Sequence, residues 1–280
     1  MDLSNFAVST ASLAGSFDNK LAAIKNAGFG SITLGSKDLI GHPQGIDGAL
    51  DVLRQSELRV NSFQLLRDFG GYEGRFLEYK LNLAKTDLQL MGRIGTDLLL
   101  VCSSTSPHAS GNVQSIVDDL ATLASLASPL GIRIGYMPLA WGRWTNEYTA
   151  AWDIIKQADV PNLGLVLDCF HIFARGTSTE KVGEIAAEKV FMVHLSDYMW
   201  DVMPALDDLI DTARHHRVFP GEGGHGDRVV GLVNSLQGIG YRGDYCFTVF
   251  NDDYLQCTPT VVLDRARRSA SWIIDSVANR

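Results

Sequence analysis

Long apolar runs and clusters of basic residues are both missing from this sequence of 280 residues. No apolar segment approaches the ~20 residues that a helix needs to cross a bilayer, so we expect no membrane partner. The formal net charge is -8, from 24 basic and 32 acidic residues, and no run of lysine and arginine occurs. Because nucleic-acid binding needs a basic face, we expect no nucleic-acid partner. The N-terminal segment lacks the regions of a signal peptide, which predicts a cytoplasmic protein.

Cysteine is scarce, and its 4 occurrences form no C-x-x-C pair and no zinc-ribbon spacing. Neither a disulfide framework nor a structural zinc is therefore expected. No G-x-G-x-x-G follows the first predicted strand, as a dinucleotide-binding open sheet would require. Linkers and low-complexity stretches are also missing, so we predict one domain over residues 1–280.

Short apolar runs rich in β-branched residues alternate with longer segments of helical spacing. Several runs are almost continuously apolar, which is typical of parallel strands buried on both faces. Such a series of strand and helix units predicts a single (β/α)8 TIM barrel, an α/β fold. The C-terminal segment 259–278 is amphipathic, and we expect it to cover the barrel or to join two copies in a homodimer. The predicted strands are residues 6–10, 31–35, 58–64, 96–103, 132–137, 163–168, 190–197 and 244–250.

Catalytic residues of TIM barrels lie at the carboxyl ends of the strands. Asp168 and His171 are found there on the sixth predicted strand, at a spacing that lets both side chains address one point. The alternative is an N-cap aspartate with an exposed loop histidine. On the seventh strand, His194 points either into the barrel mouth or into the layer between strands and helices. We predict that these three residues are catalytic.

Two further segments could bind an anion. Arg67 follows the third predicted strand, where a guanidinium could clamp a carboxylate or a phosphate. A pair with Asp68 or a solvated loop arginine is the alternative. The glycine-rich segment 215–226 could let backbone amides approach an anion.

Six motifs resemble one known family, and the similarity extends over almost the whole chain. They are FQLLRDFGG, RIGYMPLAWGRWTNEY, LVLDCFHIFARG, FMVHLSD, RHHRVFPGEG and VFNDDY. In this order and at these strand ends, they resemble the xylose-isomerase-like barrels, the sugar phosphate isomerases and epimerases. The resemblance implies a TIM barrel and a dehydratase- or isomerase-like enzyme for a small carboxylated, hydroxylated ring. The substrate-binding residues that we expect are Arg67, Tyr136, Trp141, Arg217 and Glu222.

The resemblance also implies a divalent metal, held by a Glu, an Asp, a His or Gln and a second Glu at the ends of strands five to eight. The matching residues here are Met137, Asp168, His194 and Thr248. A thioether and a hydroxyl replace two carboxylates, which are the ligands that Mg²⁺ and Mn²⁺ prefer. We therefore expect this metal site to be lost or severely weakened. A rearranged site of Asp168, His171 and His194, suited to zinc or iron, is the alternative.

Three functions remain open on these grounds. Our prediction is a metal-independent lyase or isomerase for a small anionic oxo-acid or hydroxylated cyclic carboxylate. His171 or His194 would be its base or acid, Arg67 and Arg217 would stabilise negative charge, and Asp168 would orient a histidine. The second is a metal-dependent isomerase or dehydratase that uses the rearranged site. The third is a non-catalytic protein that binds a small molecule in the same pocket.

Overall fold

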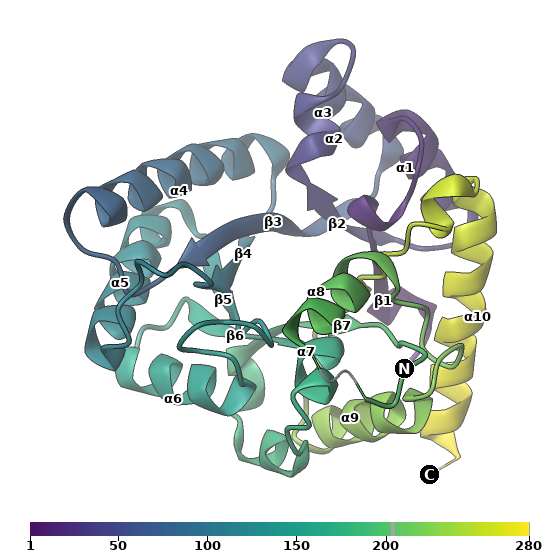
Figure 1. The fold of residues 1–280 in the computed structure, drawn as a ribbon. Coiled ribbons are helices and arrows are strands. Elements are labelled where there is room, and N and C mark those ends of the chain that lie inside the picture. The colour runs from purple at the N-terminus through teal and green to yellow at the C-terminus, as the bar shows by residue number, and fades with distance from the viewer. Residues whose placement is uncertain (203–204, 280) are drawn as a thin grey trace.

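A closed barrel of eight parallel strands forms the centre of the computed structural model, which describes residues 1–202 and 205–279 (Figure 1). The strands follow one another around the barrel in sequence order, and β1 pairs with β8 to close it. This arrangement confirms the predicted (β/α)8 fold. The strands are β1 (Phe6–Ser9), β2 (Ser31–Gly35), β3 (Arg59–Phe69), β4 (Leu98–Ser103), β5 (Arg133–Met137), β6 (Leu163–Asp168), β7 (Val190–Leu195) and β8 (Tyr245–Phe247).

Helices surround the barrel, and none in the described part of the chain is long and apolar enough to span a membrane. In Figure 1, α8 lies in front of the barrel rather than in the outer ring. The indole N–H of Trp200 donates to Thr212 Oγ1 of α8 at 2.7 Å. The helices are α1 (Phe17–Asn26), α2 (Ser36–Ile40), α3 (Gly45–Ser56), α4 (Gly74–Ile94), α5 (Val113–Ala127), α6 (Tyr148–Ala158), α7 (Cys169–Ala174), α8 (Leu206–His215), α9 (Gly226–Gly238) and α10 (Pro259–Ala278).

The strands separate two apolar clusters. The inner one fills the barrel with side chains such as Leu100, Val166 and Met192, and Met137 belongs to it. The outer one lies between the strands and the helices and is much larger. Both faces of the strands are therefore buried, which explains their continuous apolar character.

One strand differs clearly from its prediction. We expected a loop after residue 64, but β3 continues to Phe69. Its pairing with β4 shifts register twice between Phe63 and Phe69, and Asp68 has a left-handed backbone with φ of 53°. The side chain of Asp68 accepts hydrogen bonds from the amide and the hydroxyl of Thr105, at 2.8 and 2.7 Å. The polar pair Arg67 and Asp68 interrupts the apolar pattern and hides this extension in the sequence.

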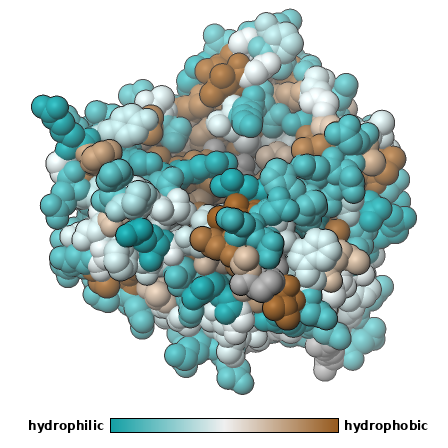
Figure 2. Space-filling view, in the orientation of Figure 1, coloured by the Kyte–Doolittle hydropathy of each residue, from teal (hydrophilic) through white to brown (hydrophobic). Residues whose placement is uncertain are grey.

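The C-terminal helix packs on the glycine-rich segment. A Cβ atom on Gly221, whose φ is +89°, would lie 3.0 Å from the Trp272 ring of α10, and one on Gly226 would lie 2.9 Å from it. Only glycine allows this approach. Most of the surface on the face seen in Figure 2 is polar, with small apolar groups between.

Candidate active site

Four strands bring polar or soft side chains together at the carboxyl end of the barrel. Met137 ends β5, Asp168 ends β6, His194 lies near the end of β7, and Thr248 directly follows β8. In the sheet, Asp168 lies opposite His194. Neighbours in register point to the same face of a sheet. His194 therefore lies on the same side as Asp168 and not among the helices.

Asp168 forms an ion pair with Arg217, and both side chains are almost completely buried. Nη1 of Arg217 donates to the two carboxylate oxygens at 3.3 and 3.0 Å. The carboxylate also caps α7, because Oδ1 accepts the amide hydrogen of Phe170 at 2.9 Å. Asp168 is therefore both the N-cap of α7, as the alternative interpretation expected, and a member of the buried cluster. Removing one partner of a buried ion pair typically costs about 3–5 kcal/mol.

The charge of Arg217 keeps Asp168 ionised. Burial alone would raise the pKa of this carboxyl group, but the Arg217 guanidinium and the two histidines outweigh that effect and hold the pKa well below its usual range. We expected Asp168 to orient a histidine. Its nearest histidine nitrogens lie at 3.7 Å (His194 Nδ1) and 3.9 Å (His171 Nε2), which is too long for a hydrogen bond. The carboxylate instead holds the arginine.

His171 is a buried residue of α7 and not the exposed loop histidine of the alternative interpretation. The amide of Ala140 donates to its Nδ1 at 3.2 Å. Because an amide N–H can only donate, Nδ1 must be unprotonated, and a neutral ring then carries its proton on Nε2. The pKa of His171 is lowered to about 3, mainly by burial; Asp168 opposes this effect, whereas Arg217 and His194 add to it. The residue is therefore a neutral hydrogen-bond donor near neutral pH.

His194 is buried, and its two ring nitrogens have no hydrogen-bond partner among the described residues. Such a polar group usually has a partner in a folded protein. A substrate group or a water molecule can supply one here. Of the two histidines, His194 is thus the one with a nitrogen free to accept a proton.

The residues present do not fit the divalent metal that the resemblance implies. Met137 is packed in the inner apolar cluster, and the Thr248 hydroxyl points to the Cys246 sulfur at 3.8 Å. The guanidinium of Arg217 already occupies the carboxylate of Asp168. Within the described ranges, no group of three or more His, Cys, Asp or Glu side chains is arranged to hold a metal ion. The rearranged site of Asp168, His171 and His194 is not formed either.

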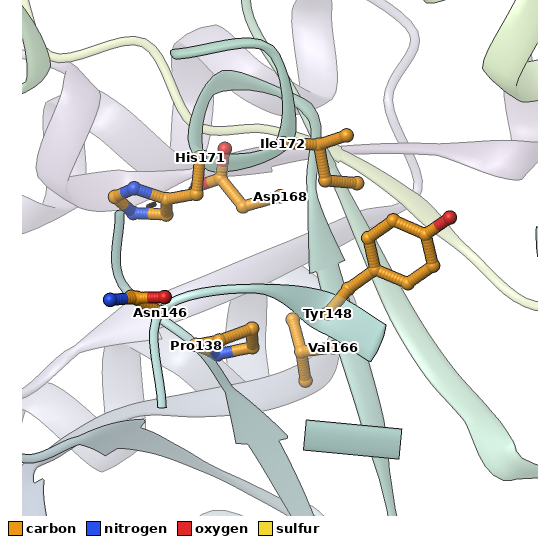
Figure 3. Close-up of a pocket in the computed structure, with 7 residues that line it drawn as sticks. All are labelled: Pro138, Asn146, Tyr148, Val166, Asp168, His171 and Ile172. Carbon is orange, nitrogen blue, oxygen red and sulfur yellow. Dashed lines mark ion pairs between the residues drawn. The ribbon is translucent and has the colours of Figure 1, made fainter. Parts of the chain in front are cut away.

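A small cavity of about 10 Å³ adjoins this cluster, which is room for about one water molecule. In Figure 3, the side chains of Asp168 and His171 lie together, and Asn146 and Pro138 lie across from them. Tyr148 and Ile172 lie in the right half of the view, and His171 and Asn146 lie in the left half. The lining residues are Pro138, Asn146, Tyr148, Val166, Asp168, His171 and Ile172.

The predicted substrate-binding residues divide into two groups. Trp141 contacts His171 edge to face, with ring centroids 5.0 Å apart. Arg67 is exposed on β3, and its backbone carbonyl accepts a hydrogen bond from Lys80 Nζ at 2.8 Å. Burial raises the pKa of the Cys102 thiol, and the Arg67 guanidinium opposes this shift, which places the charge of Arg67 near the barrel mouth. Trp141 and Arg217 contact members of the cluster, and Arg67 lies near the carboxyl end of β3.

Tyr136 and Glu222 lie outside this cluster, and their predicted role in substrate binding stays a prediction. Tyr136 is buried in the outer apolar cluster, because side chains alternate along β5 and its neighbour Met137 takes the inner position. Glu222 pairs with Arg265 of α10 at 3.0 Å and accepts a hydrogen bond from the Tyr254 hydroxyl at 2.8 Å. It fastens the glycine-rich segment to the C-terminal helix.

Asp197 was missed by the sequence reasoning, although it belongs to the motif FMVHLSD. Its fully buried carboxylate accepts amide hydrogens from Tyr198, Gly221 and His225, at 2.8, 3.3 and 2.9 Å. We expected the glycine-rich segment to bind an anion through its amides. Two of its amides do bind a carboxylate, but this one belongs to the protein itself.

The geometry defines a class of protein: a (β/α)8 barrel with buried ionisable side chains at the carboxyl ends of its strands. The chain belongs to the xylose isomerase-like TIM barrel family, whose model matches residues 21–275. It is 36% identical to 3-dehydroshikimate dehydratase of Pseudomonas aeruginosa over 253 residues, 90% of this chain and 39% of that protein. It is 27% identical to inosose isomerase of Bacillus subtilis over 165 residues, 58% of this chain and 55% of that protein.

Among solved structures, a xylose isomerase-like TIM barrel/4-hydroxyphenylpyruvate dioxygenase fusion protein superimposes with a TM-score of 0.91 at 32% identity. The match covers 98% of this chain and 43% of that chain. This chain thus spans less than half of the fusion protein and of the dehydratase. The predicted family is confirmed. The prediction of a dehydratase- or isomerase-like enzyme agrees with the names of these relatives.

Proposed function

We propose that this protein is a lyase or isomerase that moves a proton beside the carbonyl group of a small anionic oxo-acid or hydroxylated cyclic carboxylate, without a divalent metal. The observation that carries the proposal is the buried cluster in which Arg217 neutralises Asp168 beside His171 and His194. The relatives named as a dehydratase of 3-dehydroshikimate and as an isomerase of inosose support a cyclic hydroxy-oxo compound as substrate.

The two histidines have different roles in this proposal. His171 keeps its proton on Nε2, so its neutral ring donates to the carbonyl oxygen and stabilises the negative charge that develops there. His194 takes the proton from the carbon next to the carbonyl. It then returns that proton either to a departing hydroxyl group or to a neighbouring carbon.

The substrate is held by charge and by aromatic contact. Arg67 binds a carboxylate, because its guanidinium is exposed near the barrel mouth and offers two parallel donors. Trp141 contacts the ring of His171 and offers an aromatic surface to the substrate. A cytoplasmic location and a homodimer formed through α10 stay predictions.

Deuterium exchange tests the proposal without choosing between elimination and isomerisation. The protein is incubated in D₂O with 3-dehydroshikimate and related cyclic oxo-acids, and the α-proton signals are followed by ¹H NMR. We expect these signals to disappear with the wild type and to do so about 10²–10⁴ times more slowly with His194→Gln. His108→Gln alters an exposed loop histidine and serves as the control, with the wild-type rate. A ligand that binds without any exchange indicates a binding protein and contradicts the proposal.

A further inference from the structure

Four oxygen atoms from three strand ends converge on one nitrogen atom of Arg217. Nη1 lies 3.3 and 3.0 Å from the two carboxylate oxygens of Asp168. It lies 3.4 Å from the hydroxyl oxygen of Ser196 and 3.5 Å from the carbonyl oxygen of Thr248. These residues end or follow β6, β7 and β8. Oxygen atoms that converge in this way are the usual surroundings of a bound cation.

The rest of the guanidinium is fixed as well. Nε donates to the carbonyl of Ala213 at 2.8 Å. The guanidinium carbon lies 4.3 Å from the centre of the Phe170 ring and 5.5 Å from that of Phe250, at distances typical of cation–π contacts. The side chain is 3% exposed, so the charge is held almost without contact to solvent.

The backbone of Arg217 is anchored on two neighbouring loops. Its amide donates to the carbonyl of Phe250 at 3.0 Å, and its carbonyl accepts a hydrogen bond from the side chain of Asn251 at 2.9 Å. The next residue, Val218, exchanges two backbone hydrogen bonds with Asp197, at 2.8 and 2.9 Å. These two loops hold the backbone of Arg217 in one position.

We propose that the guanidinium of Arg217 takes the place of the divalent cation that the resemblance implies, as an internal and permanent cation bound to Asp168. Uncharged side chains at positions 137 and 248 agree with this proposal, because the guanidinium of Arg217 carries one positive charge and Asp168 alone balances it. The proposal deepens the proposed function, since it names the group that makes a metal-free site stable. It also has its own consequence: the charge of Arg217 keeps metal ions out of the site.

Titration with Mn²⁺ alone tests this consequence. Free Mn²⁺ is measured by electron paramagnetic resonance in chelator-stripped protein. The parent is the double variant Met137→Glu/Thr248→Glu, which restores the two carboxylates while Arg217 is kept. Adding Arg217→Gln removes the charge but retains a hydrogen-bond donor to Asp168. We expect this change to tighten Mn²⁺ binding by roughly tenfold or more, because it removes a positive charge next to the ion.

Two matched variants control the comparison. Arg217→Lys keeps a positive charge, so it should exclude Mn²⁺ as the parent does. Arg214→Gln removes an exposed charge from α8 and should leave the affinity of the parent unchanged. Near-UV circular dichroism checks the fold of each protein, and if Arg217→Gln does not fold, the lysine variant decides the test. A lysine variant that gains Mn²⁺ affinity overturns the proposal.

Two other results would also overturn it. One is equal Mn²⁺ affinity in the parent with and without Arg217→Gln. The other is stoichiometric Mn²⁺ binding by the wild type that Asp168→Asn removes. Because no turnover is measured, a failure of the proposed reaction leaves these outcomes intact. Conversely, metal-free turnover by the wild type, combined with equal Mn²⁺ affinities of the parent with and without Arg217→Gln, would contradict only the proposed role of Arg217.

Discussion

Asp168 and His171 lie 3.9 Å apart, and the site holds the carboxylate ionised and the imidazole neutral. The Arg217 guanidinium keeps the pKa of Asp168 well below its usual range despite burial, whereas burial lowers the pKa of His171 to about 3. An ionised carboxylate therefore lies beside a neutral imidazole over the whole neutral range. Paired groups with such opposed environments are typical of sites that divide acid and base roles.

The neutral state of His171 predicts a pH dependence of stability. Its pKa is 6.5 in the unfolded reference and about 3 in the folded protein. Between these values the unfolded chain binds a proton that the folded protein does not. Stability is thus lost as the pH falls from 6.5 towards 3, by up to about 1.4 kcal/mol per pH unit for this group.

Urea unfolding at a series of pH values between 7 and 4 measures this loss. His171→Gln should flatten the curve in this window, because the titrating ring is gone. His108→Gln, which alters an exposed histidine, should keep the slope of the wild type. Equal slopes for the two variants would show that His171 titrates alike in both states.

At the scale of elements, the long connection between β7 and α9 delivers Arg217 to the site. Asp197 shapes this connection, because its carboxylate gathers amides from Gly221 and His225. Gly223 lies against the same carboxylate, and a Cβ atom on it would be 2.5 Å from Asp197 Oδ1. At Gly224 the nearest atom would be 3.5 Å away, an ordinary contact.

These neighbouring glycines give a matched pair of substitutions. Gly223→Ala should destabilise the protein by about 1–3 kcal/mol, because the added methyl group would lie 2.5 Å from both the Asp197 carboxylate and the backbone carbonyl of Tyr198 and would force them to shift. Gly224→Ala should change the unfolding free energy by less than about 0.5 kcal/mol. Urea unfolding of both variants measures the difference. The same loss in both would mean that Asp197 does not shape the loop.

The sequence predicted the strands and the place of the site, because buried parallel strands are continuously apolar and their carboxyl ends meet. It could not predict the pairing of Asp168 with Arg217. These residues are 49 positions apart, and α7, β7 and α8 lie between them, so no local spacing relates the two side chains. The sequence also did not show which face Tyr136 takes, because a shift of one residue along a strand reverses the face.

On the scale of the whole molecule, the net charge of -8 says little about the pocket. Asp168, the buried carboxylate of the cluster, is balanced by Arg217, and Arg67 adds an exposed positive charge near the barrel mouth. The buried cluster is thus less acidic than the chain as a whole. This difference fits a small anionic substrate better than a polyanion.

The most direct test of the central claim measures metal content and turnover in the same sample. Chelator-treated protein is assayed with 3-dehydroshikimate and related cyclic oxo-acids, and its metal is determined by elemental analysis. We predict that turnover persists with less than about a tenth of an equivalent of metal per chain, because Arg217 and the two histidines supply the charge and the proton transfer. Turnover that is lost on chelation and restored by Mg²⁺, Mn²⁺ or Zn²⁺ would contradict the account.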